Sequence, residues 1–185
     1  MRLKTESFQH KKRVFNMKIF NRVSGWRKYK KQNITSKKTI GFVPTMGALH
    51  PGHLSLINKS KKENSLTLVS IFINKTQFND KNDYEKYPQK TEEDIIKLKK
   101  ASVDFLLLPK HKELYSDNYR FKVTENSFSN IMEGKHRSGH FDGVLTVVMK
   151  LLIGIMPSVA YFGEKDYQQY TLISDMAKSF LLETK

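Results

Sequence analysis

The sequence predicts an α/β fold in which a parallel sheet is covered by helices on both faces. Three observations support this prediction. Short apolar segments alternate along the chain with longer segments of helical periodicity. The apolar segments are short continuous runs, which suit strands buried on both faces. Gly, Pro and Asn separate the two kinds of segment, and a length of 185 residues fits one domain.

The elements can be assigned in order from this pattern. The predicted strands cover residues 39–44, 66–73, 103–108 and 159–162, with 121–124 as an optional member. The predicted helices cover residues 52–62, 91–101, 143–155 and 167–182, with a short helical turn at 129–132. Ahead of them, the sequence MKIF from Met17 and the helix-like segment after it would be an adequate start. Residues 1–16 are therefore expected to be a basic extension and residues 17–185 the folded domain.

Excess positive charge is concentrated in the first 40 residues. They contain 13 basic residues and 1 acidic residue, a net charge of +12, whereas the other 145 contain 20 and 17, a net charge of +3. A nucleic-acid-binding face would ordinarily extend through the folded body or along one of its helices. The distribution argues against nucleic acid as the partner and favours a solvated, partly disordered extension, with a polyanion-binding arm as the alternative.

Several other classes of protein are disfavoured. The chain has no cysteine, which excludes a disulfide framework, a thiolate metal site and a cysteine nucleophile. The basic N-terminal segment lacks the apolar run of about 7–15 residues found in secretory signals. The longest apolar run, residues 144–156, is interrupted by Lys150 and is shorter than the roughly 20 residues of a membrane span. We expect a cytoplasmic protein that does not enter membranes.

A strand-loop-helix segment, IGFVPTMGALHPGHLSLI, carries the strongest indication of chemistry. Its predicted strand ends near Pro44, its loop contains Gly47 and Gly52, and its helix begins near His53. Such an arrangement places free backbone N–H groups and the positive end of a helix dipole where an anion can bind. We therefore expect a phosphate site in residues 47–53.

His50 and His53 lie one helical turn apart in this segment and can face the same phosphate. Imidazole suits this role because it donates hydrogen bonds in either protonation state. When a nucleotidyl group is transferred, negative charge grows on the oxygens around the α-phosphorus, and donors aimed there are strongest where water is excluded. The alternatives are two surface histidines at a helix start, or a zinc site, which is disfavoured because no further ligand cluster stands nearby.

The segment VPTMGALHPGHLSLI resembles the signature of pantothenate synthetases, a branch of the HxGH nucleotidylyltransferase superfamily. Further blocks follow in that family's order: SIFINKTQF, DYEKYP, VDFLLLP with ELY, RSGHFDGVLTVVMKLL and YFGEKDYQQYTLI. Together they extend from residue 41 to about residue 178. The resemblance implies a Rossmann-like, doubly wound parallel sheet that binds nucleotide in residues 17–185 and pairs as a homodimer.

The resemblance also implies the residues of the ATP site. We expect His53, His50 and Lys165 to be catalytic. Lys165 would contact phosphate and Asp166 the ribose, while Gly163 would leave room for the nucleotide. FGEKD follows a predicted strand, so it is expected at the same carboxyl edge of the sheet as the histidines. The expected ATP-binding set is Met46, Gly47, Ala48, Leu49, His50, Pro51, Gly52, His53, Gly163, Glu164, Lys165 and Asp166.

The second substrate site is assigned by the same resemblance. Gln77 and Gln169 match the family's pantoate-binding glutamines, and an amide that both donates and accepts fits a substrate with hydroxyls beside a carboxylate. Asn74 and Tyr87 fall on positions that line the same cleft, and Arg137 belongs to the RxGHF block. These five residues are expected to bind pantoate or β-alanine.

The implied reaction has two steps and needs no protein nucleophile. The carboxylate of pantoate attacks the α-phosphate of magnesium-ATP to give pantoyl adenylate, and the amine of β-alanine then displaces AMP. The residues position the substrates and stabilise the negative charge of the phosphates, and Mg2+ contributes to that stabilisation. The sequence leaves the magnesium ligands unassigned. Asp94, in the acidic helix start TEED, is the candidate neighbour, although a helix N-terminus attracts carboxylates anyway.

Departures from the family concern four residues and the length. Lys75, Gln89, Ser138 and Asp142 replace residues that are usual in the family blocks. Family members continue into further strands, a loop that closes over ATP and a C-terminal lid domain, which these 185 residues do not contain. A missing lid would admit water to the adenylate, so we expect impaired activity. The chain is expected to be either a truncated N-terminal domain or a natural short form with reduced or lost activity. The alternatives are a catalytically silent nucleotide-binding or dimerisation domain and another HxGH nucleotidylyltransferase.

Overall fold

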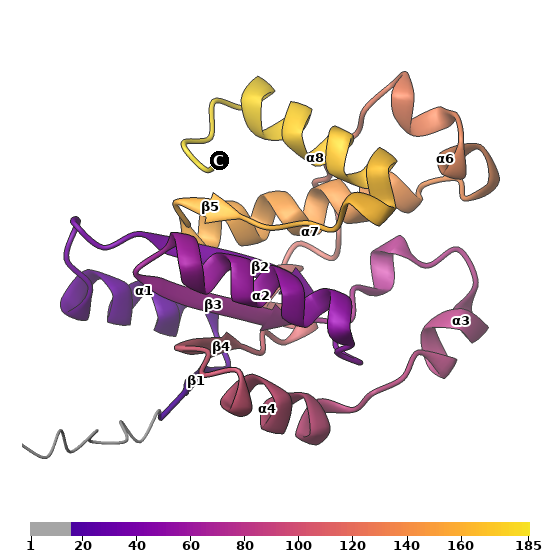
Figure 1. Cartoon of the computed structure of the whole chain (residues 1–185). Coiled ribbons are helices and arrows are strands. Elements are labelled where there is room, and N and C mark those ends of the chain that lie inside the picture. The colour runs from indigo at the N-terminus through magenta and orange to yellow at the C-terminus, as the bar shows by residue number, and fades with distance from the viewer. Residues whose placement is uncertain (1–15) are drawn as a thin grey trace, which may run out of the picture.

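A sheet of five parallel strands forms the centre of the molecule (Figure 1). The computed structural model describes residues 16–185, so the expectation for residues 1–15 of the basic extension lies outside the described residues. The strand order is β1-β4-β3-β2-β5, and every neighbouring pair is parallel. The strands are β1 (Lys18–Phe20), β2 (Ile40–Thr45), β3 (Leu66–Ile71), β4 (Phe105–Leu107) and β5 (Val159–Ala160).

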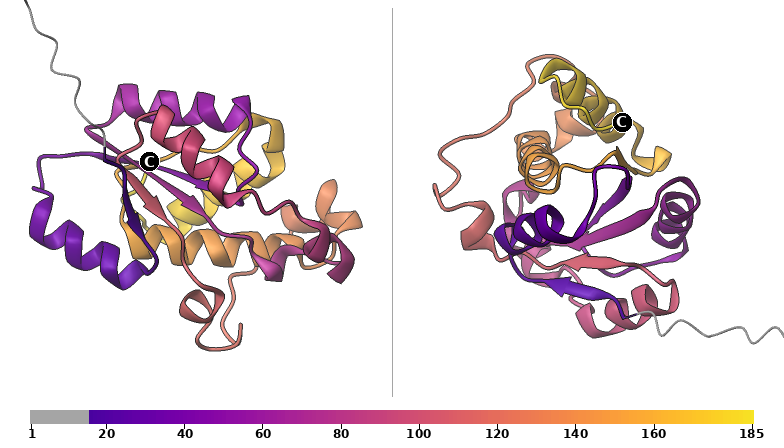
Figure 2. Two further views of the ribbon diagram at one scale, coloured as in Figure 1. Left: turned by 90° about the horizontal axis from the view of Figure 1, so that it is seen from below. Right: turned by 90° about the vertical axis from the view of Figure 1, so that its left-hand side faces the viewer.

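Helices cover both faces of this sheet (Figure 2). One face carries α1 (Val23–Asn33) and α7 (His140–Ile155), with α8 (Tyr167–Ser179) packed outside α7. The other carries α2 (Pro51–Glu63) and α4 (Thr91–Lys100). This is the predicted doubly wound arrangement.

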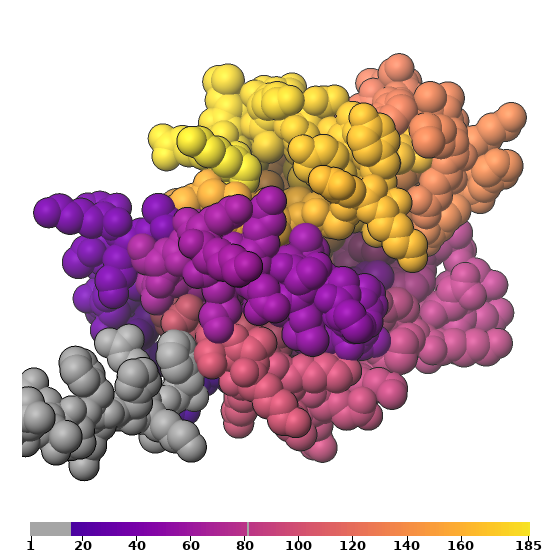
Figure 3. Space-filling model, viewed as in Figure 1, coloured from indigo at the N-terminus to yellow at the C-terminus, as the bar shows by residue number. Residues whose placement is uncertain are grey.

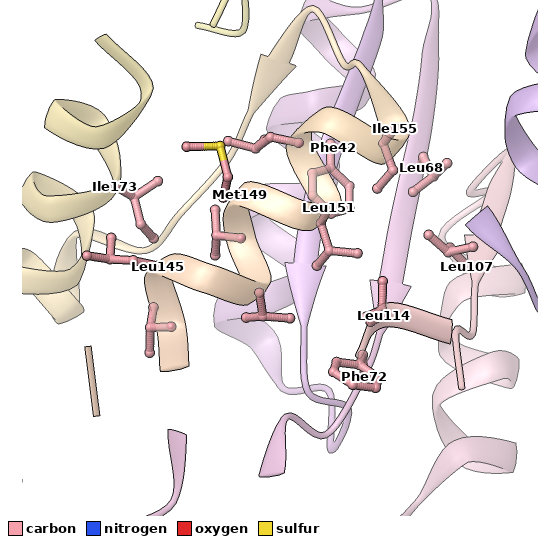
Figure 4. Close-up of a cluster of buried hydrophobic side chains, with 14 of the residues drawn as sticks. Phe42, Leu68, Phe72, Leu107, Leu114, Leu145, Met149, Leu151, Ile155 and Ile173 are labelled. Atoms are coloured by element: carbon pink, nitrogen blue, oxygen red, sulfur yellow. The ribbon is translucent and has the colours of Figure 1, made fainter. Parts of the chain in front are cut away.

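Two hydrophobic clusters correspond to the two faces. Alternate residues of a strand point to opposite faces, so Phe42 joins the cluster with α7 while Val43 joins the cluster with α2 and α4. Figure 4 shows the first cluster, where Leu151 and Ile155 of α7 point toward the strands. Because both faces are covered, the strands are continuous apolar runs, as the sequence pattern indicated.

Helix α1 is fixed to the C-terminal end of α7. Trp26 is fully buried, and its indole N–H donates to the carbonyl of Ile155 at 3.2 Å. The Lys30 ammonium donates to the carbonyls of Ile155 at 3.2 Å and Met156 at 2.6 Å. The last carbonyls of a helix lack partners within it, so these two side chains satisfy them. Part of the basic charge before residue 40 therefore has a structural role.

Short helical turns complete the connections. They are η1 (Lys75–Gln77), α3 (Lys81–Lys86), α5 (His111–Leu114), η2 (Phe128–Asn130), α6 (Glu133–His136) and η3 (Glu164–Asp166). Within residues 16–185, no helix combines the length and the hydropathy that crossing a bilayer requires.

The expected strands and long helices are confirmed except at one segment. Residues 121–124, all of them described, form no strand, so the optional assignment was wrong. The backbone N–H of Val123 donates to the Thr146 hydroxyl of α7 at 2.9 Å, and this segment therefore follows α7 instead of the sheet. The predicted helix at 143–155 begins earlier, at His140. Strand β1 and helix α1 were foreseen only as MKIF and a helix-like segment.

Candidate functional site

A cleft of about 290 Å³ opens at the carboxyl ends of β2 and β5. The chain continues from β2 to β3 on one side, whereas β5 pairs with β2 on the other side, so the strand order changes direction at this point. Open α/β sheets bind ligands at such a switch point. In the space-filling view, the yellow C-terminal residues lie directly against the purple residues around α2 on the same face of the molecule (Figure 3).

The lining of the cleft divides into a polar set and an apolar set. Side chains that donate or accept hydrogen bonds come from the end of β2, from the start of α2, from the region of η1 and α3, and from the start of α8. They are Thr45, His50, His53, Asn74, Gln77, Tyr87, Asp166 and Gln169. The apolar lining is Pro44, Met46, Phe72, Val144, Val147, Val148, Leu151 and Phe162.

The structure therefore brings together residues expected for both substrates. Met46, His50, His53 and Asp166 of the expected ATP site line this cleft, as do four of the five residues expected for the second substrate: Asn74, Gln77, Tyr87 and Gln169. Each group comes from segments far apart in the sequence. Their assembly in one cleft is the arrangement that a two-substrate site requires.

Other expected site residues lie outside the lining. Lys165 and Glu164 are exposed on η3, and neither they nor Gly163 line the cleft. Arg137 donates to Glu133 at 2.5 Å and lies 3.3 Å from His140 Nε2. The contact of Lys165 with phosphate and the contact of Arg137 with substrate remain predictions.

The loop of residues 47–49 differs from its expected form, because its backbone N–H groups already have partners. The N–H of Gly47 donates to the Thr45 hydroxyl at 3.2 Å. Those of Ala48 and Leu49 donate to the Asp94 carboxylate at 2.7 Å and 2.8 Å. The prediction of free N–H groups for phosphate was thus wrong for these three residues.

Two histidines cap the start of α2 through their side chains. The N–H of Gly52 donates to Nδ1 of His50 at 3.1 Å, and the N–H of His50 donates to Nδ1 of His53 at 3.4 Å. A backbone N–H can only donate, so both Nδ1 atoms act as acceptors and each neutral ring carries its proton on Nε2. The ring centroids are 4.0 Å apart. The helix cap therefore fixes one tautomer in both rings.

Electrostatics keeps His53 neutral near pH 7. Burial lowers the pKa of the half-buried His53 imidazole, and the neighbouring His50 lowers it further, against smaller opposing effects of Asp94 and Asp166. The Nε2–H group of neutral His53, next to the exposed His50, can donate a hydrogen bond to an anion without first losing or gaining a proton.

The wall that carries Gln77 is held by a buried network. The Asn74 amide, 1% exposed, donates to the carbonyl of Gly143 at 3.0 Å and to Oε1 of Gln77 at 3.2 Å. The buried His140 places its Nδ1 2.8 Å from the carbonyl of Gln77. Asn74 thus fixes the turn that presents Gln77 to the cleft.

Sequence reasoning missed the apolar half of the lining. Val144, Val147, Val148 and Leu151 are spaced three or four residues apart, so they share a face of α7. The apolar run that indicated a buried helix was the available signal. The apolar run alone could not show that one face of α7 lines the cleft.

The expectation that Asp94 neighbours magnesium is not supported. Its side chain is fully buried, and its two oxygens accept the N–H groups of Ala48 and Leu49. Within residues 16–185, no group of three or more His, Cys, Asp or Glu side chains is placed to hold a metal ion.

Comparisons with known proteins give a consistent result. A family model described as pantoate-beta-alanine ligase matches residues 18–185. The pantothenate synthetase of Bdellovibrio bacteriovorus is 54% identical over 145 residues, covering 78% of this chain and 58% of that protein. The enzyme of the same name from Legionella pneumophila (strain Lens) is 47% identical, covering 90% and 66%.

Solved structures agree with these matches. The pantoate-beta-alanine ligase of Francisella tularensis, described as complexed with beta-gamma ATP and beta-alanine, superposes with a TM-score of 0.89 at 46% identity. The match covers 92% of this chain and 65% of that one. Pantothenate synthetase from Thermus thermophilus gives a TM-score of 0.84 at 37% identity, covering 91% and 60%. The chain thus spans about three fifths of the length of the relatives it matches.

Proposed function

The chain belongs to the pantoate-beta-alanine ligase family, and on that premise we propose that its cleft binds ATP and pantoate for the ATP-dependent formation of pantothenate. The single observation that best supports this proposal is the meeting of the capped His50 and His53 pair with Gln77 and Gln169 in one cleft. A phosphate site and a site for a hydroxylated acid are then adjacent. Transfer of a nucleotidyl group to a carboxylate requires that proximity.

His50 and His53 are proposed to contact the α-phosphate of ATP through their Nε2–H groups. The attack of a carboxylate increases the negative charge around phosphorus, and donors that are already oriented stabilise it without reorganising. The caps that orient the two rings use only their Nδ1 atoms, which leaves Nε2 for the ligand. Asp166, at the start of α8, is proposed to accept the ribose hydroxyls. Lys165 is proposed to approach the phosphates from the same turn.

Pantoate carries a carboxylate, two hydroxyls and a carbon that bears two methyl groups. Gln77 and Gln169 supply amides for the polar groups, while Val144, Val147 and Val148 offer an apolar surface for the methyl groups. In this pose the carboxylate faces the histidine pair. The carboxylate forms a bond to the α-phosphorus while the bond between the α-phosphorus and the oxygen that bridges to the β-phosphate breaks, which gives pantoyl adenylate and releases pyrophosphate. The amine of β-alanine then attacks the acyl carbon of the adenylate, forms the amide bond, loses a proton and displaces AMP.

Magnesium is proposed to accompany ATP. Mg2+ is commonly held by one or two carboxylates together with substrate phosphates and water. Asp94 does not fit as a ligand, because its side chain is fully buried and does not line the cleft, and its oxygens are directed at the N–H groups of Ala48 and Leu49. No catalytic step therefore depends on a metal ion held by Asp94. A homodimer in the cytoplasm completes the proposal and rests on the family resemblance.

Calorimetric titration tests the proposal. ATP with Mg2+ and then pantoate are added to the chain, β-alanine follows, and AMP release is measured. The proposal is supported if the wild-type chain binds both ligands and His53→Asn binds them at least about tenfold more weakly. A tenfold loss of affinity corresponds to the loss of one hydrogen bond to a charged group. The control is His136→Asn, because His136 is exposed and lies outside the cleft. Absence of pantoate binding would overturn the proposal, whereas binding of both ligands without AMP release identifies a catalytically silent domain.

A further inference from the structure

The buried carboxylate of Asp94 contacts the loop that leads into the histidine pair. Asp94 lies in the first turns of α4 and is 0% exposed. A buried carboxylate is unfavourable unless hydrogen bonds or a counter-charge compensate it. Here Oδ2 accepts the N–H of Ala48 at 2.7 Å and Oδ1 accepts the N–H of Leu49 at 2.8 Å. Two consecutive backbone groups of the loop are thus fixed by one side chain.

Lys97, one turn further along α4, holds the same loop from its carbonyl side. Its Nζ donates to the carbonyl of Leu49 at 2.8 Å and lies 3.7 Å from Oδ1 of Asp94. The lysine therefore provides both a partner for the loop and a counter-charge for the carboxylate. Helix α4 contacts residues 48 and 49 at three polar points.

The loop needs such support because Ala48 is in a left-handed region that glycine adopts freely but a residue with a Cβ does not. Gly47 has a φ of +87°, and Ala48, which has a Cβ, has a φ of +50°. A residue other than glycine keeps a left-handed conformation only when its surroundings stabilise it. The N–H groups that Asp94 binds belong to Ala48 and to the residue after it.

The position of His50 depends directly on this geometry. His50 follows Leu49 immediately, and as the N-cap of α2 it has the extended backbone that a cap requires (φ −129°, ψ 175°). A change in the direction of the chain at Leu49 would displace the cap and, with it, the hydrogen bonds to both Nδ1 atoms. The orientation of the two Nε2–H groups thus depends on residues 48 and 49.

We propose that Asp94 is a positioning residue, whose carboxylate holds residues 48 and 49 so that His50 and His53 direct Nε2–H into the cleft. Asp94 does not line the cleft, so it acts through the loop and not on the ligand. We call the three hydrogen bonds that join Asp94 and Lys97 to Ala48 and Leu49 the clamp. The effect of the clamp on ATP binding rests on the proposed function, whereas the clamp itself does not. The role also differs from metal binding, because the fully buried carboxylate does not reach the cleft where a metal would meet the phosphates.

The test compares Asp94→Asn with Glu92→Gln. Both remove one negative charge from the same end of α4, but Glu92 is exposed and makes no contact with the loop in the described structure. In Asp94→Asn one oxygen becomes an amide that faces a donor, so one loop N–H loses its acceptor. Amide exchange of Ala48 and Leu49 should accelerate about tenfold, and ATP should bind about tenfold more weakly, the equivalent of one hydrogen bond to a charged group. The Mg2+ concentration at half-maximal ATP binding should not change.

Three results for Asp94→Asn would contradict the proposal. Unchanged amide exchange, ATP affinity within twofold of the wild type, or a shift in the Mg2+ midpoint that marks a metal ligand would each overturn it. If the wild-type chain binds no ATP, the proposed function fails separately. The clamp is then decided by amide exchange and by the imidazole 15N shifts of His50 and His53, which should lose the Nε2–H pattern in Asp94→Asn. If that variant does not fold, Lys97→Met replaces it, because it removes the donor to the carbonyl of Leu49. Faster amide exchange of Ala48 and Leu49 in Lys97→Met would support the proposal, and wild-type exchange would overturn it.

Discussion

Gly143→Ala should weaken pantoate binding while leaving the fold intact. Gly143 lies in α7, where the turn η1 crosses the helix closely. A Cβ at this position would lie 2.4 Å from the carbonyl oxygen of Thr76 and 2.7 Å from Cα of Gln77. Ordinary contact begins at 3.4 Å, so the turn must move by about 1.0 Å, the difference between 3.4 and 2.4 Å. The Asn74 amide, which donates to the carbonyl of Gly143, moves with it.

The expected magnitudes separate binding from stability. Overpacking of a close contact costs about 1–3 kcal/mol, and the higher helix propensity of alanine returns about 1 kcal/mol. The net loss of unfolding free energy is therefore about 0–2 kcal/mol. A displacement of about 1 Å at a substrate-positioning group has a larger effect on function. We expect the dissociation constant of pantoate to rise about tenfold, or about 1.4 kcal/mol.

The assay is calorimetric titration of pantoate in the presence of ATP, with urea unfolding of each variant. Gly25→Ala is the matched control, because Gly25 also lies in a helix and an added Cβ there meets nothing within 4 Å. It should stabilise the chain by about 0.5–1 kcal/mol and leave pantoate affinity unchanged. Equal pantoate affinity for Gly143→Ala and the wild type would refute the role assigned to the turn.

Two further predictions concern stability. Trp26→Ala should lower the unfolding free energy by about 3–5 kcal/mol, because it removes a fully buried indole and a hydrogen bond to the end of α7. Urea unfolding measures this loss, and a value below about 1 kcal/mol would contradict the anchoring of α1. Lowering the pH should destabilise the chain, since burial lowers the pKa values of His53 and His140 in the folded state below the ordinary value of 6.5. The unfolded chain then binds protons first, so this stability is fully present above about pH 6.5 and is lost as the pH falls toward the folded-state pKa values. Urea unfolding between about pH 7.5 and pH 5 should show this decline, and a smaller one in His53→Asn; a stability that rises on acidification would contradict the lowered pKa values.

Local patterns were sufficient to predict strands β2 to β5, helices α2, α4, α7 and α8, and the position of the histidine pair. Residues 47–53 begin two positions after Thr45, the last residue of β2, so one continuous segment specifies the strand, the turn and the helix start. The partner of its backbone N–H groups could not be predicted in this way. Asp94 lies 46 residues after Ala48, and an acid at a helix start is explained equally well by the helix dipole.

Contacts distant in sequence also account for the other differences. The RSGHFDGV block was recognised, but the close approach of Thr76 to Gly143 depends on the packing of η1 against α7. Residues 121–124 have a strand-like composition, yet a hydrogen bond to Thr146 directs them along α7. Helix α1 carries a single fully buried residue, Trp26, among many basic ones, so its apolar face gave a weak signal.

Imidazole NMR with and without ATP tests the central claim most directly. The 15N spectra should show the Nδ1 atoms of His50 and His53 as acceptors and the protons on Nε2, the tautomer that the helix cap requires. Addition of ATP should shift the Nε2 resonances of both rings and leave that of the exposed His136 unchanged. A proton on Nδ1 of either ring, or resonances that do not respond to ATP, would contradict the account of the site.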